Sequence, residues 1–190
     1  MSEQFKQNTS IGPMRLGYIL AFFKFMREIN SDHETRTYYR YMVFKGPKDF
    51  LRLFTYFVFQ SLCPKIGIRF TGTGIILSCL IDPTTRRIYG ICHVEIHSLK
   101  GNGSDEGELG IVLTRERIGK GMGKTLMEHC LARCRASGLS KVTLTVDVDN
   151  SRAVNLYRNM GFVIIRKVEK GDIRYLTGEM VDYYGMELKL

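Results

Sequence analysis

The sequence has no hydrophobic run long enough to cross a lipid bilayer. Its most apolar stretches are Leu16–Met26 and Leu51–Cys63, and a basic residue, Lys24 or Arg52, interrupts each of them. A transmembrane helix needs about 20 consecutive apolar residues. The polar start, Met1–Thr9, also lacks the basic and then apolar layout of a secretory signal. We therefore expect no membrane-spanning segment and no secretory leader.

Cysteine is scarce as well. The chain has five cysteines, an odd number, and their spacing does not resemble a disulfide framework. Such usage is typical of a reducing compartment, so we expect a cytoplasmic location. Repeats, low-complexity tracts and long linkers are also absent. At 190 residues, 44% hydrophobic and 25% charged, the chain has the length and composition of one globular domain over residues 1–190.

Acidic residues are in deficit. Lys and Arg number 28 against 19 Asp and Glu, which gives a net charge of +9. An excess of this sign favours an anionic partner, such as nucleic acid, a membrane surface or a polyanionic small molecule. A basic surface that is merely well solvated would have the same composition. Charge alone therefore does not decide between these interpretations.

Hydrophobic periodicity predicts helices early in the chain and a run of strands after them. The expected helices are Gly17–Asn30, Asp32–Phe44, Lys48–Cys63, Gly121–Ser137 and Ser151–Met160. The expected strands are Ile11–Met14, Gly74–Ile81, Arg87–His97, Glu108–Leu113, Val142–Val148, Phe162–Lys167 and Tyr184–Leu190. Pro13 places the first strand at a sheet edge, and Lys100–Gly107 is expected to be a polar hairpin connection. The order predicts a mixed α/β domain: a mostly antiparallel twisted sheet of about six or seven strands, with about four or five helices and one strand–helix–strand crossover.

A glycine-rich segment, Ile118–Lys124, lies between an expected strand and an expected helix. Its three glycines alternate with other residues, so the backbone can approach a ligand closely, and the free N–H groups of a helix start favour phosphate. The P-loop pattern does not fit, because it needs a glycine five residues before Gly123, where Ile118 stands. The dinucleotide fingerprint fails at Lys124, where its third glycine would fall. Glycines that serve only a tight turn remain an alternative.

A second motif follows the glycine loop and helps to decide between the interpretations of that loop. Asn150, Ala153, Leu156, Tyr157 and the pair Gly161-Phe162 match the pattern Asn-x-x-Ala-x-x-Leu-Tyr-x-x-x-Gly-Phe. Together with a loop of the form Arg/Gln-x-x-Gly-x-Gly/Ala, this pattern resembles the GNAT superfamily of N-acetyltransferases. Within the loop, Ile118 stands where that family has Arg or Gln, and Arg117 can supply the missing charge. The stretch Ser31–Lys48 is also similar to the opening helices of GNAT domains of the protein-lysine-acetyltransferase type.

The resemblance implies a site for acetyl-CoA within residues 107–162, with helices over residues 17–63 on the acceptor side. It assigns pantetheine contacts and carbonyl polarisation to the strand backbone, and pyrophosphate contacts to the loop amides. The implied cofactor-binding residues are Ile111, Val112, Leu113, Ile118, Gly119, Lys120, Gly121, Met122, Gly123, Lys124, Asn150 and Ala153. Asn150 can also be a plain helix N-cap. No metal is implied.

The resemblance also implies that an amine attacks acetyl-CoA directly in a ternary complex. Tyr157 is then the candidate general acid, and Glu108 the candidate general base. Their simpler interpretations are a packed aromatic residue and an exposed glutamate at a strand end. The alternation of His93, Glu95 and His97 puts all three on one sheet face. A solvent-facing side is the favoured interpretation of that face, and a second set of bases or a metal triad are alternatives.

A metal site is also conceivable at His129, Cys130 and Cys134. The two cysteines, however, continue an apolar helical stripe formed by Met122, Leu126, Met127 and Leu131, so we expect them in the core.

Three classes of function follow. The favoured one is an acetyl-CoA-dependent N-acetyltransferase, and the others are a CoA-binding module without catalysis and a basic nucleic-acid-binding protein. The acceptor is expected at Asn30–Gly72, Leu99–Gly107 and Gly171–Tyr184, where candidate lining residues are Tyr38, Tyr39, Arg40, Tyr41 and Arg69. A protein amino group, a polyamine, a sugar amine and an aminoglycoside all stay open, as do the acyl-chain preference and a homodimer.

Overall fold

The computed structural model of the chain describes residues 9–32, 69–70, 73–97, 105–174 and 177–190. Its strands are β1 (Ser10–Pro13), β2 (Arg69–Phe70), β3 (Thr73–Ile81), β4 (Ile88–His97), β5 (Asp105–Leu113), β6 (Leu139–Asp147), β7 (Val163–Ile173) and β8 (Met180–Lys189). Its α-helices are α1 (Ile19–Ser31), α4 (Met122–Ala136) and α5 (Ser151–Asn159), and two short 3-10 turns are η1 (Leu16–Tyr18) and η2 (Arg115–Arg117).

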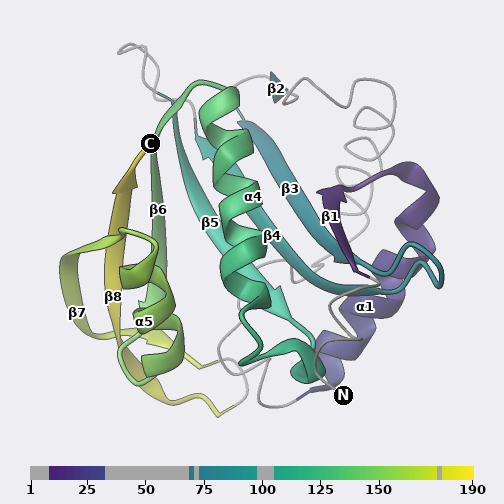
Figure 1. The fold of residues 1–190 in the computed structure, drawn as a ribbon. Coiled ribbons are helices and arrows are strands. Elements are labelled where there is room, and N and C mark those ends of the chain that lie inside the picture. Colours follow the sequence, from purple (N-terminus) through teal and green to yellow (C-terminus); the bar gives the residue numbers. More distant parts are fainter. Residues whose placement is uncertain (1–8, 33–68, 71–72, 98–104, 175–176) are drawn as a thin grey trace.

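All the strands belong to one twisted sheet in the order β1-β3-β4-β5-β6-β8-β7, with β2 paired to β3 beside that path (Figure 1). Among the described strands, only β5 and β6 are parallel, because α4 crosses between them and returns the chain to the same end of the sheet. The mixed α/β prediction is therefore confirmed. Pro13, which cannot donate a backbone hydrogen bond, lies in the edge strand β1 opposite Ser78, as expected.

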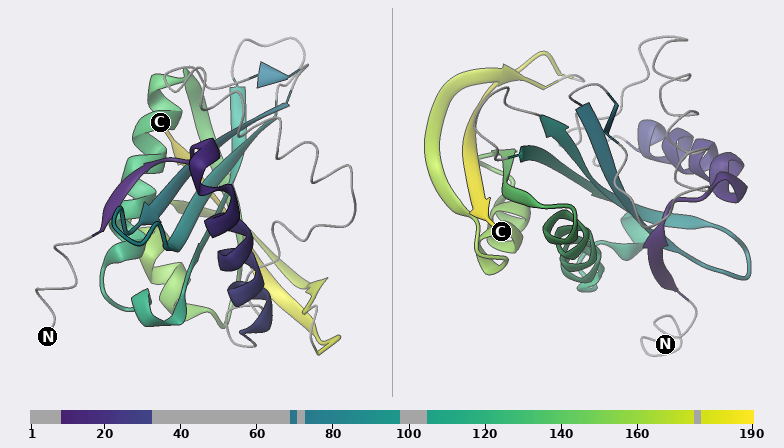
Figure 2. Two further views of the ribbon diagram at one scale, coloured as in Figure 1. Left: turned by 90° about the vertical axis from the view of Figure 1, so that its right-hand side faces the viewer. Right: turned by 90° about the horizontal axis from the view of Figure 1, so that it is seen from above.

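The helices cover both faces of this sheet (Figure 2). On one face α4 and α5 bury the larger core, which includes Leu126, Cys130 and Cys134 of α4, so these cysteines belong to the core as predicted. On the other face α1 buries a second core through Phe22 and Phe25. The apolar residues of α1 recur at helical spacing, so one stripe of the helix meets the sheet while its polar residues face outward.

Several boundaries differ from the sequence prediction. β5 begins at Asp105, so it takes up part of the connection expected at Lys100–Gly107. β7 continues to Ile173 and β8 begins at Met180, so their hairpin is much longer than predicted. Most of the residues added to β7 are exposed, and backbone pairing rather than burial defines them, which hydrophobic periodicity does not detect.

The helices expected at Asp32–Phe44 and Lys48–Cys63 lie outside the described residues, apart from Asp32, whose extended backbone ends α1. Within the described ranges, no helix is both long enough and apolar enough to span a membrane.

Candidate functional site

The two parallel strands of the sheet separate at their carboxyl ends. β5 and β6 pair from Asp105–Leu139 to Glu108–Thr143, and their register ends there. β5 remains paired to β4 as far as Leu113, while β6 remains paired to β8, so each strand follows its other neighbour and the two diverge (Figure 1). In the described part of the chain, the edge of Ile111–Leu113 that faces β6 therefore has no strand partner. Such an edge can pair with the amide groups of an extended ligand.

The glycine loop follows β5 after Thr114 and the η2 turn, and it leads into α4. Gly119 and Gly121 both have φ of 76°, a left-handed conformation that costs other L-residues about 1–2 kcal/mol. Gly121 is the N-cap of α4, so the helix begins at the loop as the sequence predicted. Gly123 has a different role: a Cβ atom there would lie 3.4 Å from side-chain atoms of Leu113 and Leu156. These are ordinary van der Waals distances, and they show that β5 and α5 both pack against the first turn of α4.

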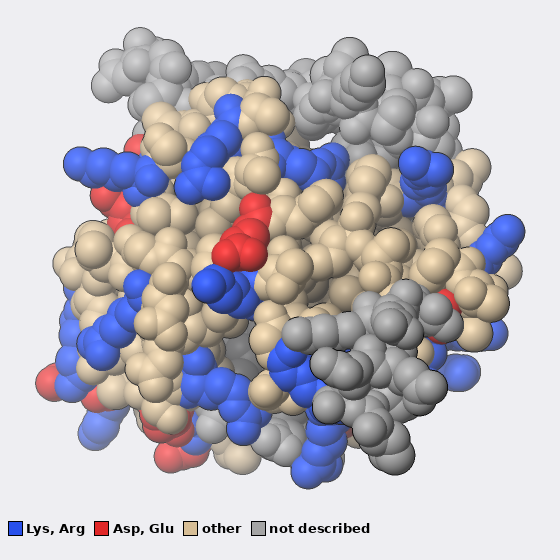
Figure 3. Space-filling model, viewed as in Figure 1, with Lys and Arg blue, Asp and Glu red and all other residues tan. Residues whose placement is uncertain are grey.

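The start of α4 offers hydrogen-bond donors and positive charge. The N–H groups of Met122, Gly123 and Lys124 belong to the first helical turn, where no earlier turn supplies acceptors. Lys120 and Lys124 are both exposed, and the first turn contains no acidic residue. Lys and Arg side chains surround a hollow at the lower end of α4 in Figure 3. The helix dipole and these charges together favour an anion at this position.

Ile118, at the head of the loop, has an extended backbone, and its N–H donates to the Arg115 carbonyl oxygen over 3.3 Å. The neighbouring Arg117 side chain is buried, with its guanidinium carbon 4.0 Å from the centre of the Tyr89 ring. A direct contact between Arg117 and a bound phosphate is therefore not available in this structure. The expectation that Arg117 supplies the charge missing at Ile118 stays a prediction, since its guanidinium packs on Tyr89 beside the loop.

α5 begins with the predicted cap. The side-chain oxygen of Asn150 accepts a hydrogen bond from the backbone N–H of Ala153 at 3.2 Å, which confirms its role as N-cap. Tyr157, two turns later, is 8% exposed and packs against Phe162 with ring centroids 5.9 Å apart. Its predicted packing role is thus present, and its acid role stays a prediction.

The candidate base lies where the strands separate. Glu108 is the last β5 residue paired to β6, and its Cα partner on β4 is Glu95. It lies within the strand, three residues after its start, and not at the strand end that the sequence predicted. Glu108 is half-buried and Glu95 is exposed, so two carboxylates lie side by side on one face.

His93 lies on this same face but is completely buried, so the prediction of a solvent-facing residue was wrong for it. The reason is Gly110 on β5: a Cβ atom there would lie 2.4 Å from the His93 ring, so the ring fills the space above the glycine. Burial lowers the pKa of His93 to about 4, which keeps the imidazole neutral near pH 7. Glu95 and His97 are exposed, as predicted.

The residues of the second suggested metal site also contact neighbouring protein groups. Nδ1 of His129 lies 3.0 Å from the Ser78 hydroxyl, and Cys130 is buried with its thiol directed to the Cys92 carbonyl oxygen at 3.5 Å. Across the described residues, no group of three or more His, Cys, Asp or Glu side chains is arranged to hold a metal ion.

Comparison with known protein families identifies a match that covers these elements. Residues 68–162 match the family model described as acetyltransferase (GNAT) family. The chain belongs to the GNAT family. The matched segment contains the diverging strands, the glycine loop and α5, which are the elements that form the candidate site.

Curated relatives of this GNAT domain include two mycothiol acetyltransferases. That of Arthrobacter sp. strain FB24 is 36% identical over 94 residues, which are 49% of this chain and 28% of the relative. That of Renibacterium salmoninarum is 34% identical over 94 residues, 49% of this chain and 27% of the relative. The alignments thus span only about a quarter of the length of these curated relatives.

Solved structures share the fold over nearly the whole chain. A GNAT acetyltransferase from Streptococcus pneumoniae has a TM-score of 0.71 at 18% identity, covering 96% of this chain and 99% of that one. A spermidine N-acetyltransferase from Vibrio cholerae, solved with CoA and spermine, has a TM-score of 0.67 at 18% identity, covering 96% and 95%. At this identity the likeness concerns the fold alone.

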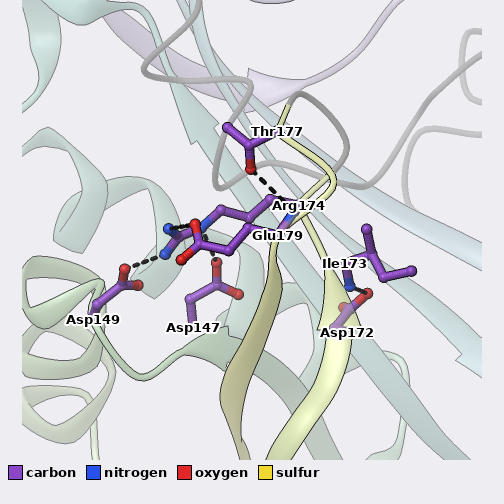
Figure 4. A network of polar contacts seen from close by, with 7 residues as sticks. All are labelled: Asp147, Asp149, Asp172, Ile173, Arg174, Thr177 and Glu179. Carbon is purple, nitrogen blue, oxygen red and sulfur yellow. Dashed lines mark hydrogen bonds and ion pairs between the residues drawn. The ribbon is translucent and has the colours of Figure 1, made fainter.

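One polar network near the GNAT site was not predicted from the sequence (Figure 4). Arg174, just after β7, contacts Asp147 at the end of β6, Asp149 before α5 and Glu179 before β8. The Arg174 side chain is only 12% exposed, so the contacts are partly shielded from water. This network holds the long β7–β8 hairpin against the β6–α5 connection. The two aspartates at the end of β6 and just after it were the available signal, but Arg174 lies 25 residues beyond Asp149 in the sequence.

The proposed acceptor residues Tyr38, Tyr39, Arg40 and Tyr41 lie outside the described residues, as does most of Leu99–Gly107. The side chain of Arg69 is likewise not described.

Proposed function

We propose that this GNAT domain is an acetyl-CoA-dependent N-acetyltransferase that acetylates a primary amine in a ternary complex. The observation that carries the proposal is the β5 edge at Ile111–Leu113, which no described strand pairs with on the β6 side, followed by the first-turn N–H groups of α4 at Met122–Lys124. An extended amide chain that ends in a pyrophosphate matches this sequence of donors and acceptors. Acetyl-CoA, when bound, supplies the acetyl group as a thioester.

The loop residues have distinct tasks in this proposal. The amides of Gly119, Lys120, Gly121, Met122, Gly123 and Lys124 hold the pyrophosphate, with Ile118 at the head of the loop. The backbone of Ile111, Val112 and Leu113 pairs with the pantetheine arm and donates a hydrogen bond to the thioester carbonyl oxygen. Asn150 and Ala153 contribute from the start of α5, where the bond between them already orders the first turn.

The transfer needs one base and one acid. Glu108 accepts a proton from the acceptor ammonium, and the neutral amine forms the new C–N bond as the C–S bond breaks. Tyr157 donates a proton to the departing thiolate, and the second proton of the acylated nitrogen returns to the Tyr157 phenolate, so the products are an amide and a thiol. Glu108 is favoured because it is half-buried at the point where the strands separate. His93 is completely buried, so it cannot reach an amine.

The distribution of basic residues helps to distinguish the enzyme from a nucleic-acid-binding protein. Arg115, Lys120 and Lys124 gather beside the loop, where a cofactor with several phosphate charges explains them locally. A basic patch for nucleic acid would extend beyond a single loop. We therefore favour the enzyme over the nucleic-acid-binding protein.

The experiment is a thiol-release screen with acetyl-CoA and longer acyl-CoAs over protein amino groups, polyamines, sugar amines and aminoglycosides. Release with at least one amine supports the proposal and identifies the acceptor class. CoA binding without release from any amine would favour the module without catalysis. Tight binding of random duplex DNA with a steep salt dependence, and none of CoA, would favour the nucleic-acid alternative.

The base assignment has its own matched pair of variants. Glu108→Gln should flatten the acid limb of the pH–rate profile, whereas Glu95→Gln, its cross-strand partner, should leave that limb in place. The opposite result would assign the base to β4.

A further inference from the structure

Tyr89 makes two separate contacts with the segment that leads into the glycine loop. Its backbone carbonyl oxygen accepts a hydrogen bond from the Thr114 N–H at 2.8 Å. Its ring lies under the Arg117 guanidinium, whose central carbon is 4.0 Å from the ring centre. Thr114 precedes the η2 turn and Arg117 is its last residue; the turn closes through a hydrogen bond from the Arg117 N–H to the Thr114 carbonyl oxygen at 2.9 Å. One residue of β4 therefore holds both ends of this turn.

Burial makes the ring contact strong. Arg117 is 6% exposed, so its charge has little access to water and the aromatic face replaces part of its hydration. Arg87 also lies over the Tyr89 ring, but at 5.0 Å, and its side chain is 46% exposed and paired with Glu28 and Glu116. The two arginines thus differ in burial: Arg117 packs on the ring away from water, whereas Arg87 is about half exposed and paired with two carboxylates.

We propose that Tyr89 and Arg117 form a clamp that positions the pyrophosphate loop. Arg117 directly precedes Ile118, so fixing its side chain on β4 sets the direction in which the chain enters the loop. The glycines that follow are flexible in the unfolded chain, and a fixed entry reduces the number of loop conformations that compete with the binding one. Both are positioning residues, and neither touches the cofactor. The proposal rests on the proposed function, because it assumes that the loop binds CoA.

The clamp makes a different prediction from a direct phosphate contact by Arg117. If the clamp positions the loop, removing either partner has the same effect, and removing both adds little. CoA affinity falls in proportion to the fraction of molecules in which the loop is ordered. The energy of the Tyr89–Arg117 contact therefore sets the largest possible loss of affinity. For a desolvated cation–π pair this corresponds to CoA binding weakened by about three- to thirty-fold. Ligands that lack the pyrophosphate should bind the variants with unchanged affinity.

The test uses isothermal titration of the full chain with CoA, and NMR titration with pantetheine, which lacks the pyrophosphate. Tyr89→Leu, Arg117→Met and the double variant should each weaken CoA binding by about the same three- to thirty-fold. Tyr89→Phe keeps the ring and should stay within about twofold of the wild type. Pantetheine binding should be unchanged in all of them. The matched control is Tyr183→Leu, which removes a ring from another arginine–aromatic pair, with Arg166 at 6.0 Å, in the β7–β8 hairpin.

Several results would overturn the clamp. Loss of CoA affinity in Arg117→Met but not in Tyr89→Leu would mean that Arg117 meets the phosphate directly. Equal losses for CoA and pantetheine would indicate general destabilisation, and normal affinity in both single variants would remove the clamp altogether. If Tyr89→Leu does not fold, Arg117→Met decides: it removes the cation from the ring, so undiminished CoA affinity would contradict the clamp. A wild-type chain that fails to bind CoA would instead refute the proposed function.

Discussion

The sharpest test of the loop assignment is Gly121→Asp, because the structure separates its effect on folding from its effect on binding. Gly121 has φ of 76°, and a Cβ atom added there would meet nothing within 4 Å. The substitution therefore introduces backbone strain without a clash. That strain costs about 1–2 kcal/mol, which for a domain of this size lowers Tm by about 2–8 °C.

The binding cost should be larger. An introduced carboxylate about 5 Å from a phosphate, at an effective dielectric constant of about 20, is repelled by about 3 kcal/mol. This corresponds to CoA binding weakened by about a hundredfold or more. Gly121→Ala carries the strain without the charge, so its loss should be about tenfold or smaller. Raising the salt concentration should reduce the difference between the two variants, since it screens the repulsion.

Gly138 supplies the matched control. It ends α4 with φ of 79°, and a Cβ atom there would also meet nothing within 4 Å. Gly138→Asp should thus lower Tm by a similar amount while leaving CoA affinity unchanged, because it lies at the opposite end of the helix. Calorimetric titration with CoA and thermal unfolding measure both quantities. A Gly121→Asp protein that is folded and binds CoA within about twofold of the Gly138→Asp protein would refute the assignment of the loop.

The remaining predictions concern three single side chains. Tyr157→Phe should lower kcat by about ten- to a hundredfold with little change in KM for acetyl-CoA, because the ring stays packed and only the hydroxyl is lost; initial rates measure both, and full activity would exclude the acid role. Asn150→Ala loses the cap and should lower Tm by about 2–4 °C, whereas Asn150→Asp keeps the acceptor for Ala153. If Asn150→Asp nevertheless binds CoA as tightly as the wild type, the residue is a cap alone. His93 has a pKa lowered from 6.5 to about 4 by burial, so the unfolded chain takes up the proton first. The neutral buried His93 therefore contributes fully to the free energy of unfolding above pH 6.5. This contribution is lost as the pH falls toward 4, and the loss is about 2 kcal/mol at pH 5. Urea midpoints between pH 7.5 and 4.5 should decline less steeply in His93→Phe, and parallel curves would contradict this account.

Local sequence signals were sufficient for the features that a few neighbouring residues determine. The glycines of Ile118–Lys124 indicated close backbone approach at a helix start, and α4 does begin there, with Gly121 as its N-cap. Asn150 was recognised as a cap because the bond to Ala153 spans only three residues. The stripe of α4 was predicted from its own periodicity, since every member lies on one helix.

Only the tertiary structure decided what depends on residues far apart in the chain. Alternation placed His93, Glu95 and His97 on one face, but Gly110 of the neighbouring strand determines that His93 alone is buried there. Arg117 looked available to a phosphate until the fold brought Tyr89 beneath it. The separation of β5 from β6 likewise has no signal within either strand, because it arises where their other neighbours, β4 and β8, keep their pairing. The type of site could therefore be predicted from short motifs, whereas the groups that are free to act in it depend on long-range packing.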